Sequence, residues 1–168
     1  MMTRQDQVSR APVFIDEVCA EVHGGTHWAA SHTVSVGTAT AVTVMLTTGE
    51  ASAGIVHVVY DIEASNAIIG VFSEAPAASG GTAITPRNSS RDTAGSSGVA
   101  LLTHTVTYST SGTVLENWAV GGANARVRGG AGARIEWVLG ASKAYLWRFV
   151  AANAGTTVVL NVYWYEEK

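Results

Sequence analysis

Histidine is the residue type in this sequence best suited to acid–base or metal chemistry, and three of its five histidines fall close together. His23, His27 and His32 lie in and after a glycine-containing loop, and Asp16 and Glu21 precede them. A zinc site needs three or four such ligands that converge in a tetrahedron, and a loop of this composition does not fix that geometry. We therefore expect no metal site here, and we interpret His23 and His27 as turn residues that hydrogen-bond to backbone groups.

Carboxylates could support glycoside hydrolysis, which needs two of them roughly 5 to 10 Å apart across a sugar cleft. Asp61 and Glu63 share one face of an expected strand, and Glu166 and Glu167 are adjacent. Neither pair is accompanied by long loops that could wall a cleft, so we interpret both as solvated charges.

Nucleophilic catalysis has no better support. Cys19 is the only cysteine, and we expect it to be a small buried hydrophobic residue, because no base partner can be assigned to it. The sequence contains no Gly-x-Ser-x-Gly elbow, no Walker phosphate loop and no dinucleotide-binding fingerprint. We predict that the protein is not an enzyme and needs no cofactor.

The composition predicts a surface that partners cover in part. Apolar residues make up 47% of the 168 residues, but charged residues make up only 14%. The charged share is well below the roughly 25% of an average soluble domain. Serine, threonine and glycine must supply the rest of the surface, or partners must bury some of it. We expect both.

Charge and hydropathy argue against two classes of partner. The formal net charge is −3, whereas nucleic-acid-binding proteins gather Lys and Arg on one face. The nearest approach to such a cluster is Arg126, Arg128 and Arg134, which we interpret as a loop. No apolar run approaches the roughly 20 residues of a membrane-spanning helix, and the polar start is not a signal peptide. With a single cysteine, these features predict a chain folded in a reducing cytoplasm, with no nucleic-acid or membrane partner.

Alternation of apolar and polar residues dominates from about residue 33 onward and predicts strands. Residues 55–63 and 156–166 alternate most clearly, and in the first of them His57, Asp61 and Glu63 take the polar face. The expected buried faces are Val56, Val58, Tyr60 and Ile62 in the first and Val158, Leu160, Val162 and Trp164 in the second. Further strands are expected at residues 33–47, 67–74, 99–109, 114–120, 133–139 and 144–151.

Short stretches rich in Gly, Ser and Thr separate the expected strands and mark chain reversals. About eight irregularly spaced strands favour an all-β fold, an antiparallel β-sandwich of jelly-roll-like order, with a closed barrel as the alternative. Only residues 13–22 could form a short helix. We expect residues 1–12 to be a flexible N-terminal segment and residues 13–168 to form a single β-sandwich domain.

Five tryptophans raise the alternative of a carbohydrate-binding β-sandwich. Trp147 and Trp164 share strand faces with other large apolar residues, so we expect them to pack in the core or an interface. Trp28 and Trp118 lie nearer to polar loops, and they are the better candidates for an exposed platform on which a sugar could stack.

Three segments together resemble one known group of proteins. Residues 21–28 read Glu-Val-His-Gly-Gly-Thr-His-Trp, residues 85–90 read Thr-Pro-Arg-Asn-Ser-Ser, and residues 162–166 read Val-Tyr-Trp-Tyr-Glu. Their order and spacing, over roughly residues 12–168, are similar to those of small virion structural proteins of tailed bacteriophages, the head decoration or cement proteins.

The resemblance implies a β-sandwich bound to the outside of an icosahedral head, often as a homotrimer, that cements neighbouring subunits of the major capsid protein. Its place would be the outer capsid surface of the virion, after assembly in the host cytoplasm. The family has no catalytic residues to transfer. The short polar N-terminus offers no extended arm, so we do not expect an arm-exchange mechanism. A tail or fibre component is the alternative within the same class, and a surface glycan partner is compatible with either.

The turn at residues 21–28 and the loop at residues 87–91, which overlaps the second segment, hold our candidates for contacts with the capsid or between subunits. The alternative is that they determine the fold, with Gly24 and Gly25 bending the backbone and Arg87 or Asn88 hydrogen-bonding to buried carbonyls. The candidates are Glu21, His23, His27, Trp28, Arg87, Asn88 and Arg91.

Overall fold

The structure is a computed structural model, and it describes residues 2–5, 12–15, 22, 24–38, 41–90, 100–120 and 136–167. Strands dominate the described residues, together with a 3₁₀ helix, η1 (Ala51–Ala53). The strands are β1 (Met2–Gln5), β2 (Pro12–Ile15), β3 (His27–Val36), β4 (Val42–Thr48), β5 (Ile55–Ala64), β6 (Ile68–Glu74), β7 (Ala77–Ser79), β8 (Thr82–Ile84), β9 (Arg87–Asn88), β10 (Ala100–His104), β11 (Thr107–Thr110), β12 (Thr113–Val120), β13 (Trp137–Leu139), β14 (Ala144–Ala151) and β15 (Thr156–Glu167).

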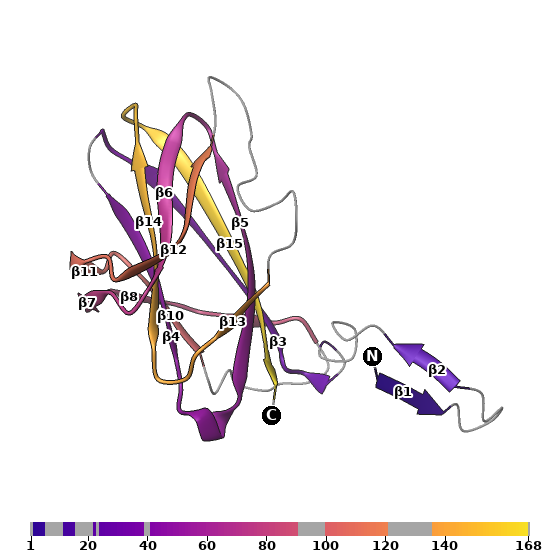
Figure 1. Cartoon of the computed structure of the whole chain (residues 1–168). Coiled ribbons are helices and arrows are strands. Elements are labelled where there is room, and N and C mark those ends of the chain that lie inside the picture. The colour runs from indigo at the N-terminus through magenta and orange to yellow at the C-terminus, as the bar shows by residue number, and fades with distance from the viewer. Residues whose placement is uncertain are drawn as a thin grey trace.

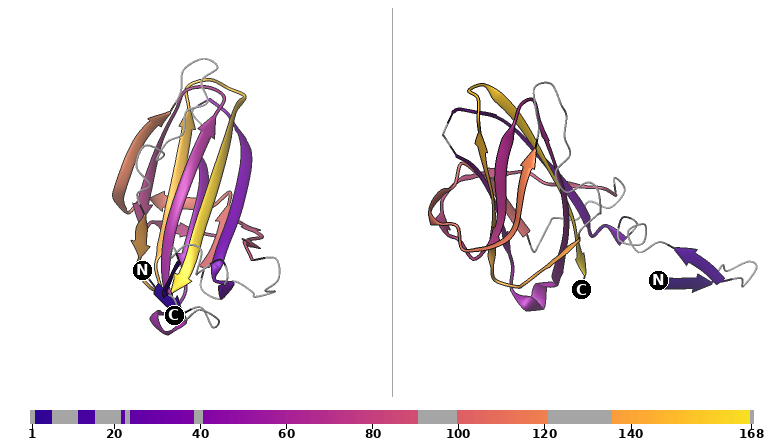
Figure 2. Two further views of the ribbon diagram at one scale, coloured as in Figure 1. Left: turned by 90° about the vertical axis from the view of Figure 1, so that its right-hand side faces the viewer. Right: turned by 45° about the horizontal axis from the view of Figure 1, so that its top comes forward.

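Two antiparallel sheets pack face to face and enclose the core. The five-stranded sheet has the order β13-β5-β15-β3-β9, and the six-stranded sheet has the order β12-β6-β14-β4-β10-β8. Figure 1 looks across the two layers, and Figure 2 (left) looks onto the five-stranded sheet, where β15 runs between β5 and β3. Two further ribbons, β1–β2 and β7–β11, are separate from both sheets. The prediction of an all-β antiparallel sandwich is confirmed.

The strand pairings of the sandwich are nested around the middle of the chain. β3 pairs with β15, β4 with β14, β5 with β13 and β6 with β12. A double ribbon folded over in this way, so that its strands are shared between two sheets, is the jelly-roll arrangement. In the sequence, β8, β9 and β10 lie between β6 and β12. They add strands at one edge of each sheet, β10 and β8 in the six-stranded sheet and β9 in the five-stranded sheet. The predicted jelly-roll-like order is therefore present.

Aromatic side chains from both sheets fill the space between them. Trp147 of β14 stacks on Phe72 of β6, and Tyr60 of β5 approaches these two rings from the opposite sheet, with centroids 5.3 and 5.4 Å away. Tyr60 is 5% exposed and donates a 2.6 Å hydrogen bond to Glu116 Oε2 of β12. Burial and this hydrogen bond raise the pKa of the Tyr60 phenol far above its ordinary value. The hydrogen bond ties the two sheets together through the core.

The alternation predicted for the two clearest strands is confirmed. On β5 every second residue is buried and the residues between are only partly buried, and β15 follows the same pattern over most of its length. The buried faces include Val56, Val58, Tyr60 and Ile62 on β5 and Val158, Leu160, Val162 and Trp164 on β15. Trp147 and Trp164 lie in the core, as expected.

Two stretches predicted as single strands are each two strands. Residues 33–47 belong to β3 and β4, which lie in opposite sheets, so the chain crosses between layers after Val36. Residues 99–109 belong to β10 and β11, which are separated at Thr105, where φ is 57°. A residue in this left-handed region cannot continue a strand. Alternation alone does not reveal where one strand ends and the next begins, because the alternation of polar and apolar residues continues through both breaks.

Short strands also occupy stretches predicted as something else. β7, β8 and β9 lie outside every predicted strand. At the start of the stretch that could form a helix, β2 pairs with β1 in an antiparallel ribbon. Figure 1 shows this ribbon to one side of the sandwich.

The β7–β11 ribbon covers part of the outer face of the six-stranded sheet. Met45 and Leu146 alternate away from the main core, and they form a second apolar cluster with Ala78 and Tyr108 of the ribbon. Arg148 extends this cover, because its Nη1 donates a 3.3 Å hydrogen bond to the Tyr108 hydroxyl. The ribbon leaves the part of this face over β6 and β12 open.

Candidate functional site

The segments that carry the resemblance, far apart in the sequence, meet at one corner of the five-stranded sheet. β9 pairs with β3, which places Asn88 opposite Trp28 and Arg87 opposite Ala29. The Asn88 side chain donates a 2.6 Å hydrogen bond from Nδ2 to the backbone oxygen of Gly25. The structure therefore joins the two segments from which contact residues were predicted.

The end of β15 belongs to the same corner. In the register of β15 with β3, Trp164 lies opposite Trp28 and Tyr165 lies opposite His27. His27 Nδ1 is 2.7 Å from the Ser89 hydroxyl, and the Ser89 amide donates a 2.9 Å hydrogen bond to the His27 backbone oxygen. All three segments are therefore in direct contact.

Some of these contacts determine the fold. Gly25 has a φ of 76°, which residues other than glycine rarely adopt, and its amide donates a 3.1 Å hydrogen bond to the backbone oxygen of Val22. Asn88 holds the carbonyl of the same glycine. These contacts agree with the alternative interpretation, in which glycine bends the backbone of the first segment and a residue of the second segment hydrogen-bonds to a carbonyl of that turn.

The predicted contact residues differ in how far they are exposed to solvent. Trp28 is only 4% exposed and packs in the core, so the prediction that it forms an exposed platform is wrong. Arg87 is exposed, and His27 is partly buried beside Ser89. Capsid or subunit contacts by these residues stay a prediction. The residues Asp16, Cys19, Glu21, His23, Arg91, Arg126, Arg128 and Arg134 lie outside the described residues.

A cluster of polar side chains lies next to this corner on the outer face of the sheet, and we call it the His57 cluster (His57, Glu136, Tyr165 and Glu167). His57, Glu136 and Tyr165 are joined by hydrogen bonds, whereas Glu167 lies at ion-pair distance from His57 Nε2 and makes no hydrogen bond with it. The rings of His57 and Tyr165 stack with centroids 4.4 Å apart, and the Tyr165 hydroxyl donates to Glu136. His57 Nδ1 is 2.6 Å from Glu136 Oε1, and Nε2 is 3.3 Å from Glu167 Oε2. A general base needs a ring nitrogen that faces the substrate, whereas both nitrogens here face carboxylates. The cluster favours a structural role, in which it fastens Glu136 and the end of β15 to β5.

A groove on the same outer face follows β3, and we call it the β3 groove. Ala29 and Ser31, two small residues of β3, lie between larger side chains of the neighbouring strands. Tyr163 lies opposite Ala29 and is 38% exposed. Asn161 lies opposite Ser31 and donates a 2.8 Å hydrogen bond to Asp61 Oδ1 of β5. The residues that line the groove are Ala29, Ala30, Ser31, Thr85, Arg87, Asn161 and Tyr163.

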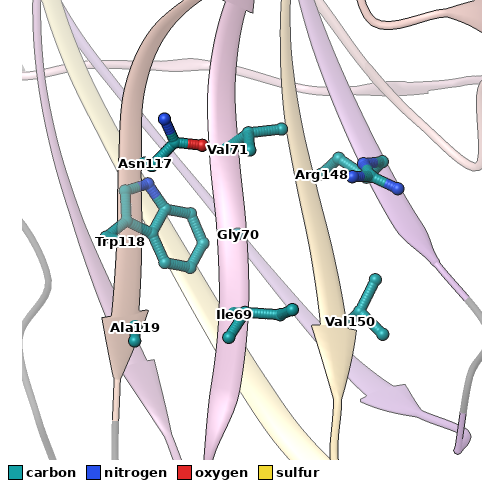
Figure 3. A pocket seen from close by; sticks show the side chains of 8 residues that line it. All are labelled: Ile69, Gly70, Val71, Asn117, Trp118, Ala119, Arg148 and Val150. Carbon is teal, nitrogen blue, oxygen red and sulfur yellow. The ribbon is translucent and has the colours of Figure 1, made fainter.

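The open part of the six-stranded sheet has an apolar hollow, which we call the β6 hollow and which Figure 3 shows. Ile69 of β6 is 62% exposed at this hollow. Trp118 of β12 lies opposite Gly70, and its ring reaches Phe149 of β14, with centroids 5.2 Å apart. Trp118 thus packs against the core, and the prediction that it forms an exposed platform is also wrong. The lining residues are Ile69, Gly70, Val71, Asn117, Trp118, Ala119, Arg148 and Val150.

The two histidines of β3 do not converge on a metal site. His27 and His32 are five residues apart on β3, so their side chains point to opposite faces of the sheet. His32 stacks instead on His104 of β10, in the other sheet, with ring centroids 4.2 Å apart. Burial, and then the neighbouring imidazole, lower the pKa of His32. Within the part of the chain that the structure describes, no group of three or more His, Cys, Asp or Glu side chains could hold a metal ion.

Apart from Arg87, which was predicted as a contact residue, the residues of the β3 groove and the His57 cluster were not recognised as sites from the sequence. Their partners are distant: Asp61 and Asn161 are 100 residues apart, and His57 and Glu136 are 79 residues apart. The one local signal is the alternation of β15, which places Asn161, Tyr163 and Tyr165 on a common face away from the core-facing residues. The sequence therefore predicts a strand face with polar and aromatic side chains, but it does not predict which strands lie on either side of it.

Comparison with protein-family models, with curated proteins and with solved structures finds no match to this chain. None of the helices in the described residues is long and apolar enough to cross a membrane.

Proposed function

We propose that this protein is a structural component of a tailed-bacteriophage particle, a decoration protein that binds the outer surface of the head and stabilises it. It acts by assembly and not by catalysis: it binds the major capsid protein, and it associates with itself as a homotrimer. The resemblance of three segments supports this choice of particle, and these segments form one contiguous corner of the fold.

The observation that carries the proposal is the exposure of large apolar side chains on strands of both sheets. Ile69 and Val138 are each 62% exposed, Leu101 56%, Ile55 48% and Val114 44%. Apolar surface of this kind, where it is contiguous, marks contacts with other proteins. Burying one such side chain fully in an interface contributes about 1.5–3 kcal/mol. A few of them per subunit would therefore support a stable contact with a shell or with another copy.

The mechanism follows from linkage. A protein that binds the assembled shell and not its free subunits shifts the assembly equilibrium toward the shell. Many copies on one head multiply a modest stabilisation at each site. The low share of charged residues, 14%, fits a chain with part of its surface covered in this way.

Light scattering at physiological salt tests the self-association. We expect a mass about three times the 17.4 kDa of the chain. The purified protein is then mixed with undecorated heads of the same phage and co-sedimented with them. A monomer that does not co-sediment with the heads would contradict the proposal.

Two variants test the surfaces. Ile69→Asp places a charge in the β6 hollow and is expected to weaken the trimer or head binding, whereas Thr157→Asp, at an exposed position of β15, serves as the matched control. Arg87→Ala is expected to weaken assembly or head binding and to leave the β circular-dichroism spectrum intact. A misfolded Arg87→Ala monomer would instead support a role in the turn, and no effect on any of these properties would exclude both roles.

A further inference from the structure

The β3 groove has the size of a ligand site and a floor of paired strands. Its volume is about 450 Å³, within the range that takes small ligands. Its floor is on β3, which pairs with β15 over ten residue positions from Thr156 to Tyr165. A site built on paired strands keeps its geometry better than a site on loops, so a ligand would not have to order it.

The register of the strands places three different chemical groups around this floor. Arg87, Ala29 and Tyr163 lie opposite one another in a row across β9, β3 and β15. Arg87 is exposed, and its guanidinium offers several hydrogen-bond donors in a planar fork. Tyr163 is 38% exposed. The groove therefore has a cation on one wall and an aromatic ring on the other, above the alanine methyl.

The next row along β3 adds hydrogen-bonding groups of known polarity. Ser31 is exposed and lies opposite Asn161. The Asn161 amide nitrogen donates to the Asp61 carboxylate, so the amide oxygen is the acceptor that this side chain offers to a ligand. An exposed hydroxyl and an oriented acceptor thus lie beside the cation and the ring.

These groups select among ligand classes. A nucleic acid needs several cations along its backbone, and among the residues that the structure describes Arg87 is the single cation in the lining of this groove. An apolar ligand would offer no hydrogen-bond partner to the Arg87 guanidinium, the Asn161 amide oxygen or the Ser31 hydroxyl. A sugar ring has an apolar C–H face for an aromatic ring, and it has hydroxyls for both a donor and an acceptor. A carboxylate on that ring would match the guanidinium.

We propose that the β3 groove binds one unit of an acidic polysaccharide. The sugar ring lies against Tyr163, its carboxylate pairs with Arg87, and its hydroxyls bond to Asn161 and Ser31. This site goes beyond the proposed decoration function and does not rest on it, since a monomer also has the groove.

The test uses calorimetric titration of the full chain with oligosaccharides of galacturonate, alginate and hyaluronan, and with a neutral galactose oligosaccharide as the matched probe. We expect binding to at least one uronate probe and an affinity at least about tenfold lower for the neutral probe. Tyr163→Ala and Arg87→Ala should each lower the uronate affinity about tenfold, because one removes the stacking surface and the other the charge. Thr157→Ala, on the same strand outside the groove, should bind as the wild type does.

Three results would overturn the proposal. These are the absence of binding to all three uronates, unchanged affinity in both Tyr163→Ala and Arg87→Ala, and equal affinity for the neutral probe. Circular dichroism and light scattering of each variant keep a folding or assembly defect apart from a binding defect. Head co-sedimentation is a separate measurement, so the decoration function can fail while the groove still binds sugar, and the reverse.

Discussion

Gly70→Ala offers a direct test of the packing described for the six-stranded sheet. Gly70 lies in a cross-strand row between Trp118 of β12 and Phe149 of β14. The tryptophan ring crosses the glycine to reach the phenylalanine. A Cβ atom at residue 70 would lie 1.9 Å from Trp118 Cη2 and within 2.4 Å of two further ring atoms. The methyl group and the ring cannot occupy these positions together.

Two opposing effects set the size of the expected change. Alanine is favoured over glycine in a strand by about 0.5–1 kcal/mol, because glycine loses more conformational freedom on folding. Forcing a large side chain out of a packed position costs about 1–3 kcal/mol, and separating an aromatic pair costs about 0.5–1.5 kcal/mol more. The steric effect is the larger, so we expect Gly70→Ala to lower the free energy of unfolding by about 1–3 kcal/mol.

The assay is urea unfolding followed by far-ultraviolet circular dichroism, on the wild type, Gly70→Ala, Trp118→Ala and the double variant. Once the ring is absent, the methyl group has space, and only the gain in backbone entropy remains. We therefore expect Gly70→Ala to be neutral or stabilising in the Trp118→Ala background, a change of sign. If Gly70→Ala were equally destabilising in both backgrounds, the ring would not be the cause and the described packing would be refuted.

Three other measurements test separate parts of the fold. The lowered pKa of His32 means that the unfolded chain binds its proton near pH 6.5 and the folded chain only at lower pH, so the free energy of unfolding should fall as the pH drops below 6.5. His32→Asn should flatten this dependence in urea titrations at several pH values, and an unchanged slope would contradict it. Tyr60→Phe removes the hydroxyl that donates to Glu116 and should lower the free energy of unfolding, measured by urea unfolding, by about 1–3 kcal/mol. A loss too small to measure would mean that this hydrogen bond does not stabilise the fold. In Gly112→Ala, a φ of 71° is combined with a Cβ position 2.1 Å from a backbone oxygen of β6, whereas in Gly155→Ala the φ is 73° and the Cβ position is in open space. Gly112→Ala should therefore lower the melting temperature more than Gly155→Ala does. Equal effects would mean that the contact with β6 adds no cost.

Strand faces could be predicted because burial along a strand is decided by neighbouring residues. In β5 the alternation from Val56 to Ile62 is complete within one short stretch of sequence. Gly112 could likewise be assigned to a turn from its neighbours, and it has the positive φ that such turns require.

The breaks and the sites could not be predicted, because they depend on pairing between distant strands. The β3 groove exists because Ala29, Arg87 and Tyr163 lie in one row, and nothing local to any of them sets that register. Trp28 has polar neighbours in the sequence, yet it is buried because β3 turns every second side chain toward the core. In each case the deciding contacts lie far away along the chain.

The nested strand order has a consequence for the newly synthesised chain. β3 pairs with β15, and about 120 residues separate the two strands. At roughly 5–20 residues per second, the ribosome needs on the order of ten seconds to make the intervening chain. During this interval β3 has emerged without its neighbour, and its free backbone groups are a template for pairing with other nascent chains. Pairings of such high contact order also form slowly, so we expect folding to be post-translational and its yield to depend on chaperones and on the rate of expression.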